Sequence, residues 1–174
     1  MDSVYEPAED SWLMENAVRL FAKGYVLDMG TGSGILAAAA AERATKVVGA
    51  DINPEAVTEA KETYPHIIFK QSDLFSAFPG EKFDTIIFNP PYLPTNEEDP
   101  EDIALNGGKD GDEVLLHFLK EAPEHLELAG CILFLTSSLT RMDRIEELLK
   151  GFKHEVVGQQ KVAFELLSVH KVWR

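Results

Sequence analysis

The chain has 174 residues, of which 30 are acidic and 16 are lysine or arginine, so its formal net charge is −14. This balance disfavours nucleic-acid binding, because phosphate recognition needs clustered cations. Apolar residues make up 45% of the chain, which argues against global disorder, and no apolar run approaches the length of a membrane span. Since the first residues lack a signal-peptide pattern, we expect a soluble cytoplasmic protein with no membrane partner.

The predicted elements alternate between helices and strands. Residues 1–23 predict a helical lead-in, with Trp12, Leu13, Ala17, Leu20 and Phe21 on one apolar face. Strands are predicted at 25–29, 46–50, 67–70, 83–88, 131–136, 155–159 and 164–172. Helices are predicted at 35–43, 54–63, 111–124 and 141–150, the second of them capped by Asn53 and starting at Pro54.

This order predicts an α/β fold with a seven-stranded, mostly parallel sheet and helices on both faces. The early strands are continuously apolar, as strands covered on both faces are. No helix separates the last two strands, so they predict an antiparallel hairpin at one edge, turning near Lys161. We expect a single domain over residues 1–174, because neither repeats nor linkers interrupt the pattern.

The cysteine and histidines indicate structural rather than metal-binding roles. The single cysteine, Cys131, lies within an apolar run and is expected in the core. The five histidines are scattered without the spacing of metal ligands, so no metal site is predicted.

A glycine-rich turn follows the first strand, in the order Asp28-Met29-Gly30-Thr31-Gly32-Ser33-Gly34. A strand that enters a helix through such a turn is typical of nucleotide sites, because glycine lets the backbone approach a ligand closely. Asp28 would repel a pyrophosphate at this position but suits a cationic ligand. A simple tight turn is the structural alternative.

Two further acids come directly after strands. Asp51 follows the second strand and could accept both hydroxyls of a ribose, whereas Asp73 follows the third and could accept an adenine amine. Each acid alone could be a solvated loop residue or a helix cap. Because the carboxyl ends of parallel strands meet at one sheet edge, the acids together predict a ligand with a ribose, an adenine and a positive charge. S-adenosylmethionine has these three features.

The segment after the fourth strand, Asn89-Pro90-Pro91-Tyr92-Leu93, carries the strongest signal for chemistry. The Asn89 side-chain oxygen and the Pro90 carbonyl could accept both hydrogens of a planar NH2 group, and Tyr92 could stack on that group. Such a site would align a nitrogen with a methyl donor and stabilise the charge that develops on it. A rigid Pro-Pro turn is the structural alternative.

These segments together resemble class I (Rossmann-like) S-adenosylmethionine-dependent methyltransferases of the HemK/PrmC type. That family methylates the glutamine of the Gly-Gly-Gln loop in peptide-chain release factors. The opening segment and a second stretch also carry the resemblance; they read Val4-Tyr5-Glu6-Pro7-Ala8-Glu9-Asp10-Ser11 and Ala104-Leu105-Asn106-Gly107-Gly108-Lys109-Asp110-Gly111. The opening segment is more similar to the shorter archaeal and eukaryotic branch than to the bacterial one.

The resemblance implies a protein-(glutamine-N5) methyltransferase with S-adenosylmethionine as cofactor and a release factor as substrate. It implies catalytic roles for Asn89, Pro90 and Tyr92, and a substrate-binding segment formed by Asn89, Pro90, Pro91, Tyr92 and Leu93. The cofactor would be held by Ser11, Asp28, Gly30, Gly32, Asp51, Asp73, Leu74 and Asn89.

The resemblance also implies a small zinc-binding activator subunit as a partner. The predicted sheet order places residues 67–70, Ile67-Ile68-Phe69-Lys70, at an edge. An apolar, weakly charged edge strand suits strand addition by a partner, although a covering loop would explain it equally well.

Residues 96–113 hold eight acids and a single base, and they should border the substrate pocket. This segment is either a solvated loop or an electrostatic guide for a basic protein surface, whose effect salt should weaken.

Two other acceptors remain open. An adenine-N6 methyltransferase acting on DNA or RNA needs a similar Asn-Pro-Pro-Tyr segment, but also a basic groove. A protein lysine methyltransferase would need a base to deprotonate the ammonium group.

Overall fold

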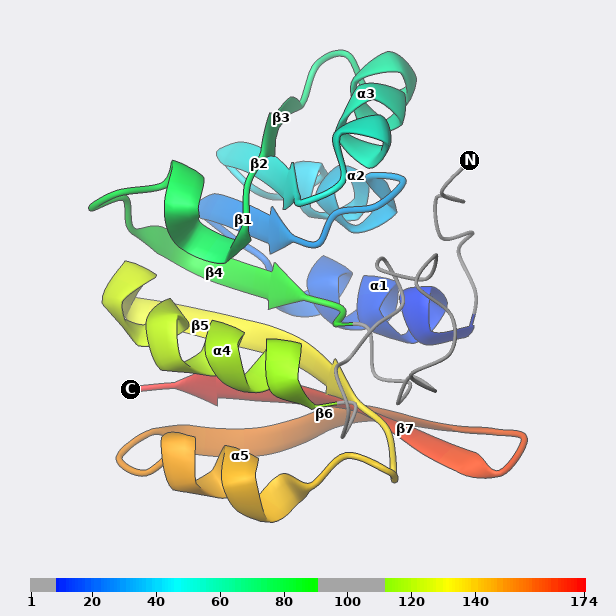
Figure 1. Cartoon of the computed structure of the whole chain (residues 1–174), viewed down its shortest axis with the longest axis vertical. Helices are drawn as coiled ribbons and strands as arrows, with labels where there is room; N and C mark the ends of the chain where they lie inside the picture. Colours follow the sequence, from blue (N-terminus) through cyan, green and yellow to red (C-terminus); the bar gives the residue numbers. More distant parts are fainter. Residues whose placement is uncertain (1–8, 91–111) are drawn as a thin grey trace.

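The computed structural model describes residues 9–90 and 112–174. In chain order (Figure 1) the elements are α1 (Glu9–Phe21), β1 (Tyr25–Met29), α2 (Ile35–Ala41), β2 (Lys46–Asp51), α3 (Pro54–Thr63), β3 (Ile68–Gln71), the 3-10 helix η1 (Leu74–Ala77), β4 (Phe83–Phe88), α4 (Glu113–Glu121), the 3-10 helix η3 (Ala122–His125), β5 (Leu126–Thr136), α5 (Met142–Leu148), β6 (Lys153–Val162) and β7 (Glu165–Trp173).

Seven strands form one sheet in the order β3-β2-β1-β4-β5-β7-β6. The first five in this order are parallel, whereas β7 runs antiparallel to both β5 and β6. The predicted fold class, a mostly parallel sheet that ends in an antiparallel hairpin, is therefore confirmed. Strand β3 is an edge strand, as predicted.

Helices cover both faces of the sheet (Figure 1). On one face, Leu27 of β1 and Ile86 of β4 pack with residues of α4 and α5. On the other, Val26 and Ile87 pack with residues of α1, α2 and α3. Neighbouring residues of one strand thus enter opposite cores, which explains the continuous apolar runs.

Most element boundaries differ from the predicted ones by a few residues, and two of these differences have a clear structural cause. Strand β5 begins at Leu126, five residues before the predicted start, because the buried Leu126 pairs with Phe83 of β4. The exposed residues that follow lie in a register shift and interrupt the apolar run. The hairpin turns at Ala163 and Phe164 rather than near Lys161. Ala163 has a φ of 49°, which residues other than glycine rarely adopt, so no glycine or asparagine marks the turn.

The apolar face predicted for the lead-in helix was partly wrong. Met14, Ala17 and Val18 of α1 are buried, whereas Trp12 and Leu20 are 56% and 64% exposed. The prediction favoured bulky residues, but the buried stripe follows the i, i+3, i+4 spacing from Met14. In the ranges that the structure describes, no helix is long and apolar enough to cross a bilayer.

Candidate active site

The carboxyl ends of β1, β2 and β4 bring three of the predicted site segments together. Met29, the last residue of β1, lies opposite Ala50 of β2 on one side and Phe88 of β4 on the other. The next residues along the three strands are Gly30, Asp51 and Asn89. The parallel topology therefore places the glycine turn between a carboxylate and an amide, as the sequence predicts.

The glycine turn has a backbone that only glycine adopts readily. Gly30 and Gly32 have φ values of 63° and 51°, in the left-handed region. A Cβ atom built on Gly32 would meet nothing within 4 Å, so this position faces open space. The turn therefore exposes its backbone at the sheet edge, where a ligand can approach closely.

Asp28 is a fully buried carboxyl group beside this turn. Its Oδ2 accepts a hydrogen bond from the Thr31 hydroxyl at 2.7 Å, whereas its buried Oδ1 has no partner among the described residues. Burial raises the pKa of Asp28 to about 7, and the hydrogen bond from Thr31 opposes the shift. A buried carboxylate with an unpartnered oxygen is suited to a cation, which would supply the missing interaction.

Asp51 stabilises the turn that it borders. Its Oδ2 accepts from the backbone N–H of Gly32 and its Oδ1 from that of Asn53, both at 2.9 Å. Each oxygen keeps a further lone pair, so the carboxylate could still accept two ribose hydroxyls. The sequence did not indicate that Asp51 also positions the glycine turn.

The predicted adenine site lies one strand further out. Asp73 is exposed beyond β3, and the neighbouring Leu74 has a φ of 43°. The buried Ser72 hydroxyl holds this bend by donating to the Leu74 carbonyl at 2.6 Å and accepting from the Ala77 N–H at 3.1 Å. A strained, non-glycine backbone fixed in this way is a feature that often accompanies function.

Asn89 contacts a residue that sequence reasoning missed. Its Nδ2 donates to Oδ2 of Asp10, at the start of α1, at 2.8 Å. Its Oδ1 is buried and has no hydrogen-bond partner in the part of the chain that the structure describes. Pro90 and Ser11 are also buried, each beside one member of this pair. The helix holds other acidic residues, so nothing in the local sequence singled out Asp10.

The remaining predicted substrate residues, Pro91, Tyr92 and Leu93, lie outside the described residues. So does most of the acidic segment, and its guiding role stays a prediction. Two of its acids are described: Glu113 is exposed at the start of α4, whereas Asp112 is fully buried and forms an ion pair with Arg144 at 3.1 Å. Asp112 is therefore not part of a solvated acidic surface.

A buried histidine of β7 contacts an exposed histidine of β6, away from the glycine turn. His170 of β7 lies 2.7 Å from both the His154 ring and the Thr136 hydroxyl. Burial lowers the pKa of His170 to about 4, and the neighbouring His154 adds to this shift. The pair holds β5, β6 and β7 together.

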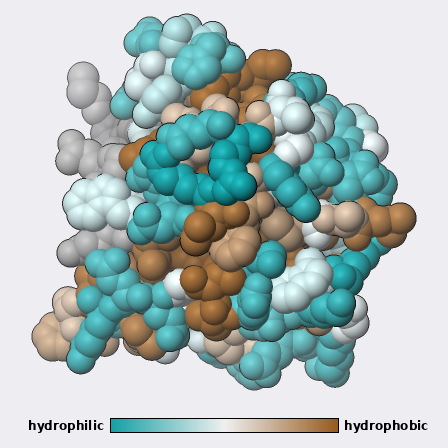
Figure 2. Space-filling view, turned by 180° about the vertical axis from the view of Figure 1, so that it is seen from behind, coloured by the Kyte–Doolittle hydropathy of each residue, from teal (hydrophilic) through white to brown (hydrophobic). Residues whose placement is uncertain are grey.

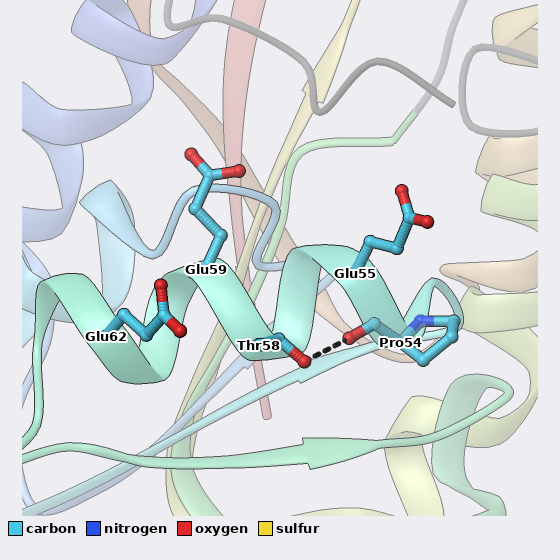
Figure 3. Close-up of a pocket in the computed structure, with 5 residues that line it drawn as sticks. All are labelled: Pro54, Glu55, Thr58, Glu59 and Glu62. Atoms are coloured by element: carbon cyan, nitrogen blue, oxygen red, sulfur yellow. Dashed lines mark hydrogen bonds between the residues drawn. The ribbon is translucent and has the colours of Figure 1, made fainter. Parts of the chain in front are cut away.

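A shallow depression lies elsewhere, along the outer side of α3 (Figure 3). It is lined by Pro54, Glu55, Thr58, Glu59 and Glu62, with Thr58 donating to the Pro54 carbonyl at 2.9 Å. The three glutamates extend from one helix, and none of the predicted site residues is among them. This depression is therefore separate from the predicted site residues.

Known proteins are similar to this chain in sequence and in fold. Residues 10–168 match the family described as "Methyltransferase small domain". A Methanocaldococcus jannaschii protein provisionally named a protein N5-glutamine methyltransferase is 47% identical over 98% of this chain and 92% of its own length. The human methyltransferase HEMK2 is 30% identical over 97% of this chain and 88% of its own.

A solved structure agrees with these relatives. The E. cuniculi Mtq2-Trm112 complex, which is described as responsible for methylating the eRF1 translation termination factor, includes a chain with a TM-score of 0.79 and 26% identity. The match covers 100% of this chain and 99% of that one. The chain therefore belongs to the methyltransferase small domain family and is a class I, S-adenosylmethionine-dependent methyltransferase.

Proposed function

We propose that the chain methylates the side-chain amide of the glutamine in the Gly-Gly-Gln loop of a peptide-chain release factor. The observation that carries this proposal is the buried Oδ1 of Asn89 at the carboxyl end of β4, which has no hydrogen-bond partner within residues 9–90 and 112–174. A buried acceptor without a partner costs about 1–3 kcal/mol, which a bound N–H donor would recover. The names of the relatives, which refer to N5-glutamine and to eRF1, indicate the same acceptor.

The described residues suggest how the acceptor amide is held. Asn89 Oδ1 would accept one amide hydrogen and the Pro90 carbonyl the other, so the nitrogen lone pair faces the methyl donor. When bound, S-adenosylmethionine supplies an electrophilic methyl group on a positively charged sulfur. The N–CH3 bond forms as the S–CH3 bond breaks, and the nitrogen then loses one proton to solvent.

The donor set at the sheet edge fits this cofactor. Asp28 presents an unpartnered oxygen to a cationic amino group, and Asp51 keeps lone pairs for the ribose. We place the adenine beside Asp73 and Leu74, the methionine end against Gly30 and Gly32, and Ser11 at the entrance. These assignments explain why buried or constrained polar groups gather at this edge.

The acceptor can be tested by transfer of labelled methyl groups. Purified chain and labelled S-adenosylmethionine are incubated with a release factor, with the same factor carrying Gln→Ala in its Gly-Gly-Gln loop, with DNA and RNA, and with a basic histone-like protein. We expect label on the unaltered release factor alone. Label confined to nucleic acid would establish an adenine acceptor, and label on lysine would establish a lysine methyltransferase.

We also propose that a small activator subunit adds to the free edge of β3. The supporting observations are that β3 has a neighbour on one side only and that Ile68 is 51% exposed. Exposed apolar residues form patches on the face shown in Figure 2, between hydrophilic ones. An unguarded apolar edge strand is suited to pairing with another chain. We also propose that this subunit binds zinc and that both proteins are located in the cytoplasm.

The edge-strand proposal predicts the effect of a charge on β3. Ile68→Asp should weaken binding of a purified Trm112 subunit by at least about tenfold, because the charge would be desolvated at the interface. Leu128→Asp on β5, where Leu128 is 78% exposed, is the matched control and should bind normally. Calorimetric titration measures both. Equal affinities for the two variants would exclude β3 as the docking strand.

A further inference from the structure

The hydrogen bond between Asn89 and Asp10 determines which way the Asn89 amide points. Asp10 is 3% exposed, and its Oδ2 accepts from Asn89 Nδ2 at 2.8 Å. A carboxylate can only accept hydrogen bonds, so it selects the NH2 end of the amide and excludes the flipped orientation. The Oδ1 atom is thereby directed away from Asp10, where it is buried and unpartnered among the described residues.

We propose that Asp10 is a positioning residue for the methyl-transfer reaction, acting through Asn89. It holds Asn89 Oδ1 as an acceptor for the substrate nitrogen, and its negative charge makes that oxygen a stronger acceptor by polarising the amide. This role rests on the proposed function, since it concerns how the substrate NH2 group is held. It also gives the N-terminal helix a part in catalysis, because α1 brings Asp10 to Asn89 from 79 positions away in sequence.

Asp10 lies at the N-terminal end of α1, in a helix of 13 residues. A carboxylate in the first turn of a helix interacts favourably with the helix dipole. A rigid helix is also a better support than a loop for a group that must fix an amide to within a few tenths of an ångström. The contact therefore favours a single orientation of the Asn89 side-chain amide.

One experiment tests the contact without any assay of methyl transfer. In ¹⁵N-labelled full-length protein, the Asn89 side-chain NH2 signals are assigned by their loss in Asn89→Asp. We expect Asp10→Ala to shift these signals and to speed their exchange with water, whereas Glu15→Ala should leave both unchanged. Glu15 is a matched control on the same helix, where it pairs with Arg19 at the surface. Unchanged Asn89 signals in Asp10→Ala would overturn the proposal, whatever the acceptor is.

The second experiment measures kinetics on the acceptor identified above. Asp10→Ala should lower kcat by about 10- to 100-fold with cofactor affinity within about threefold, because the misoriented amide fails mainly in the transition state. Asp10→Asn keeps an oxygen that can accept from Asn89 but loses the charge and the strict selection of the NH2 end, so it should recover part of the lost rate. If Asp10 were a general base, both variants would lose activity equally and the pH profile would change. Equal losses, or a loss of cofactor binding without a change in kcat, would overturn the positioning role.

Discussion

Replacing Asn89 by alanine should lower kcat for methyl transfer by about 10²- to 10³-fold, the cost typical of removing one preorganised polar group from a transition state. Asn89 follows β4 directly, and its buried Oδ1 has no partner among the described residues. The variant loses the acceptor that aligns the substrate nitrogen, whereas Asp28 and Asp51 remain in place. Cofactor affinity should therefore stay within about threefold. Single-turnover transfer and equilibrium cofactor binding measure the two effects.

Two further variants show whether the loss of kcat in Asn89→Ala comes from the missing acceptor oxygen. Asn89→Asp preserves the shape but places a second carboxylate 2.8 Å from that of Asp10, so we expect a comparable loss of rate. Gln159→Ala also removes an amide, one that hydrogen-bonds to Ser168 on the distant β6–β7 hairpin, and it should retain normal activity. A large loss of cofactor binding in Asn89→Ala would instead show that this residue serves the cofactor.

The parts of the site that sequence analysis could predict are those that depend on topology. Continuous apolar runs mark β1 and β4, and a parallel sheet brings the residues after such strands to a common edge. Asp28, Asp51 and Asn89 were found in this way, because each lies at or next to the end of a predicted strand. Their roles in binding stay predictions, but their position at one edge follows from the strand register.

The parts that could not be predicted depend on packing between distant segments. The bond from Asn89 to Asp10 joins residues 79 apart, and the bond from His170 to Thr136 joins residues 34 apart. Neither pair has a local pattern, because each contact exists only once helices and strands have packed. The face of α1 was mispredicted in part for the same reason: Trp12 is exposed, whereas Met14 and Val18, which were not predicted on that face, are buried.

The pKa of Asp28, raised to about 7 by burial, predicts that cofactor binding depends on pH. A cationic ligand prefers the ionised carboxylate, so at low pH binding must release a proton. Affinity for S-adenosylmethionine should therefore rise by about tenfold between pH 6 and pH 8 and then level off. Asp28→Asn should bind about 10- to 100-fold more weakly at pH 8, with a flatter pH profile. Calorimetric titration at several pH values measures both.

The stability of the chain without cofactor should depend on Asp28 in the opposite way: ionisation of this carboxyl group, which strengthens cofactor binding, should lower the free energy of unfolding. Its pKa in the folded chain lies above its ordinary value of 3.8, so its contribution to the free energy of unfolding is present below pH 4 and is lost as pH rises towards 7. The slope for one such group is about 1.4 kcal/mol per pH unit. Without cofactor, Asp28→Asn should therefore be more stable than the unaltered chain at pH 8, and this advantage should shrink on acidification.

The difference in free energy of unfolding between Asp28→Asn and the unaltered chain separates the effect of Asp28 from that of other titrating groups. His170, whose pKa is lowered to about 4, destabilises the fold as pH falls below its ordinary value, but it does so in both proteins. Urea unfolding from pH 4 to pH 8 gives the difference directly. A buried carboxylate that lowers the stability of the cofactor-free protein but strengthens ligand binding has a functional rather than a stabilising role. An Asp28→Asn chain that is less stable at every pH and still binds the cofactor normally would show that Asp28 is structural.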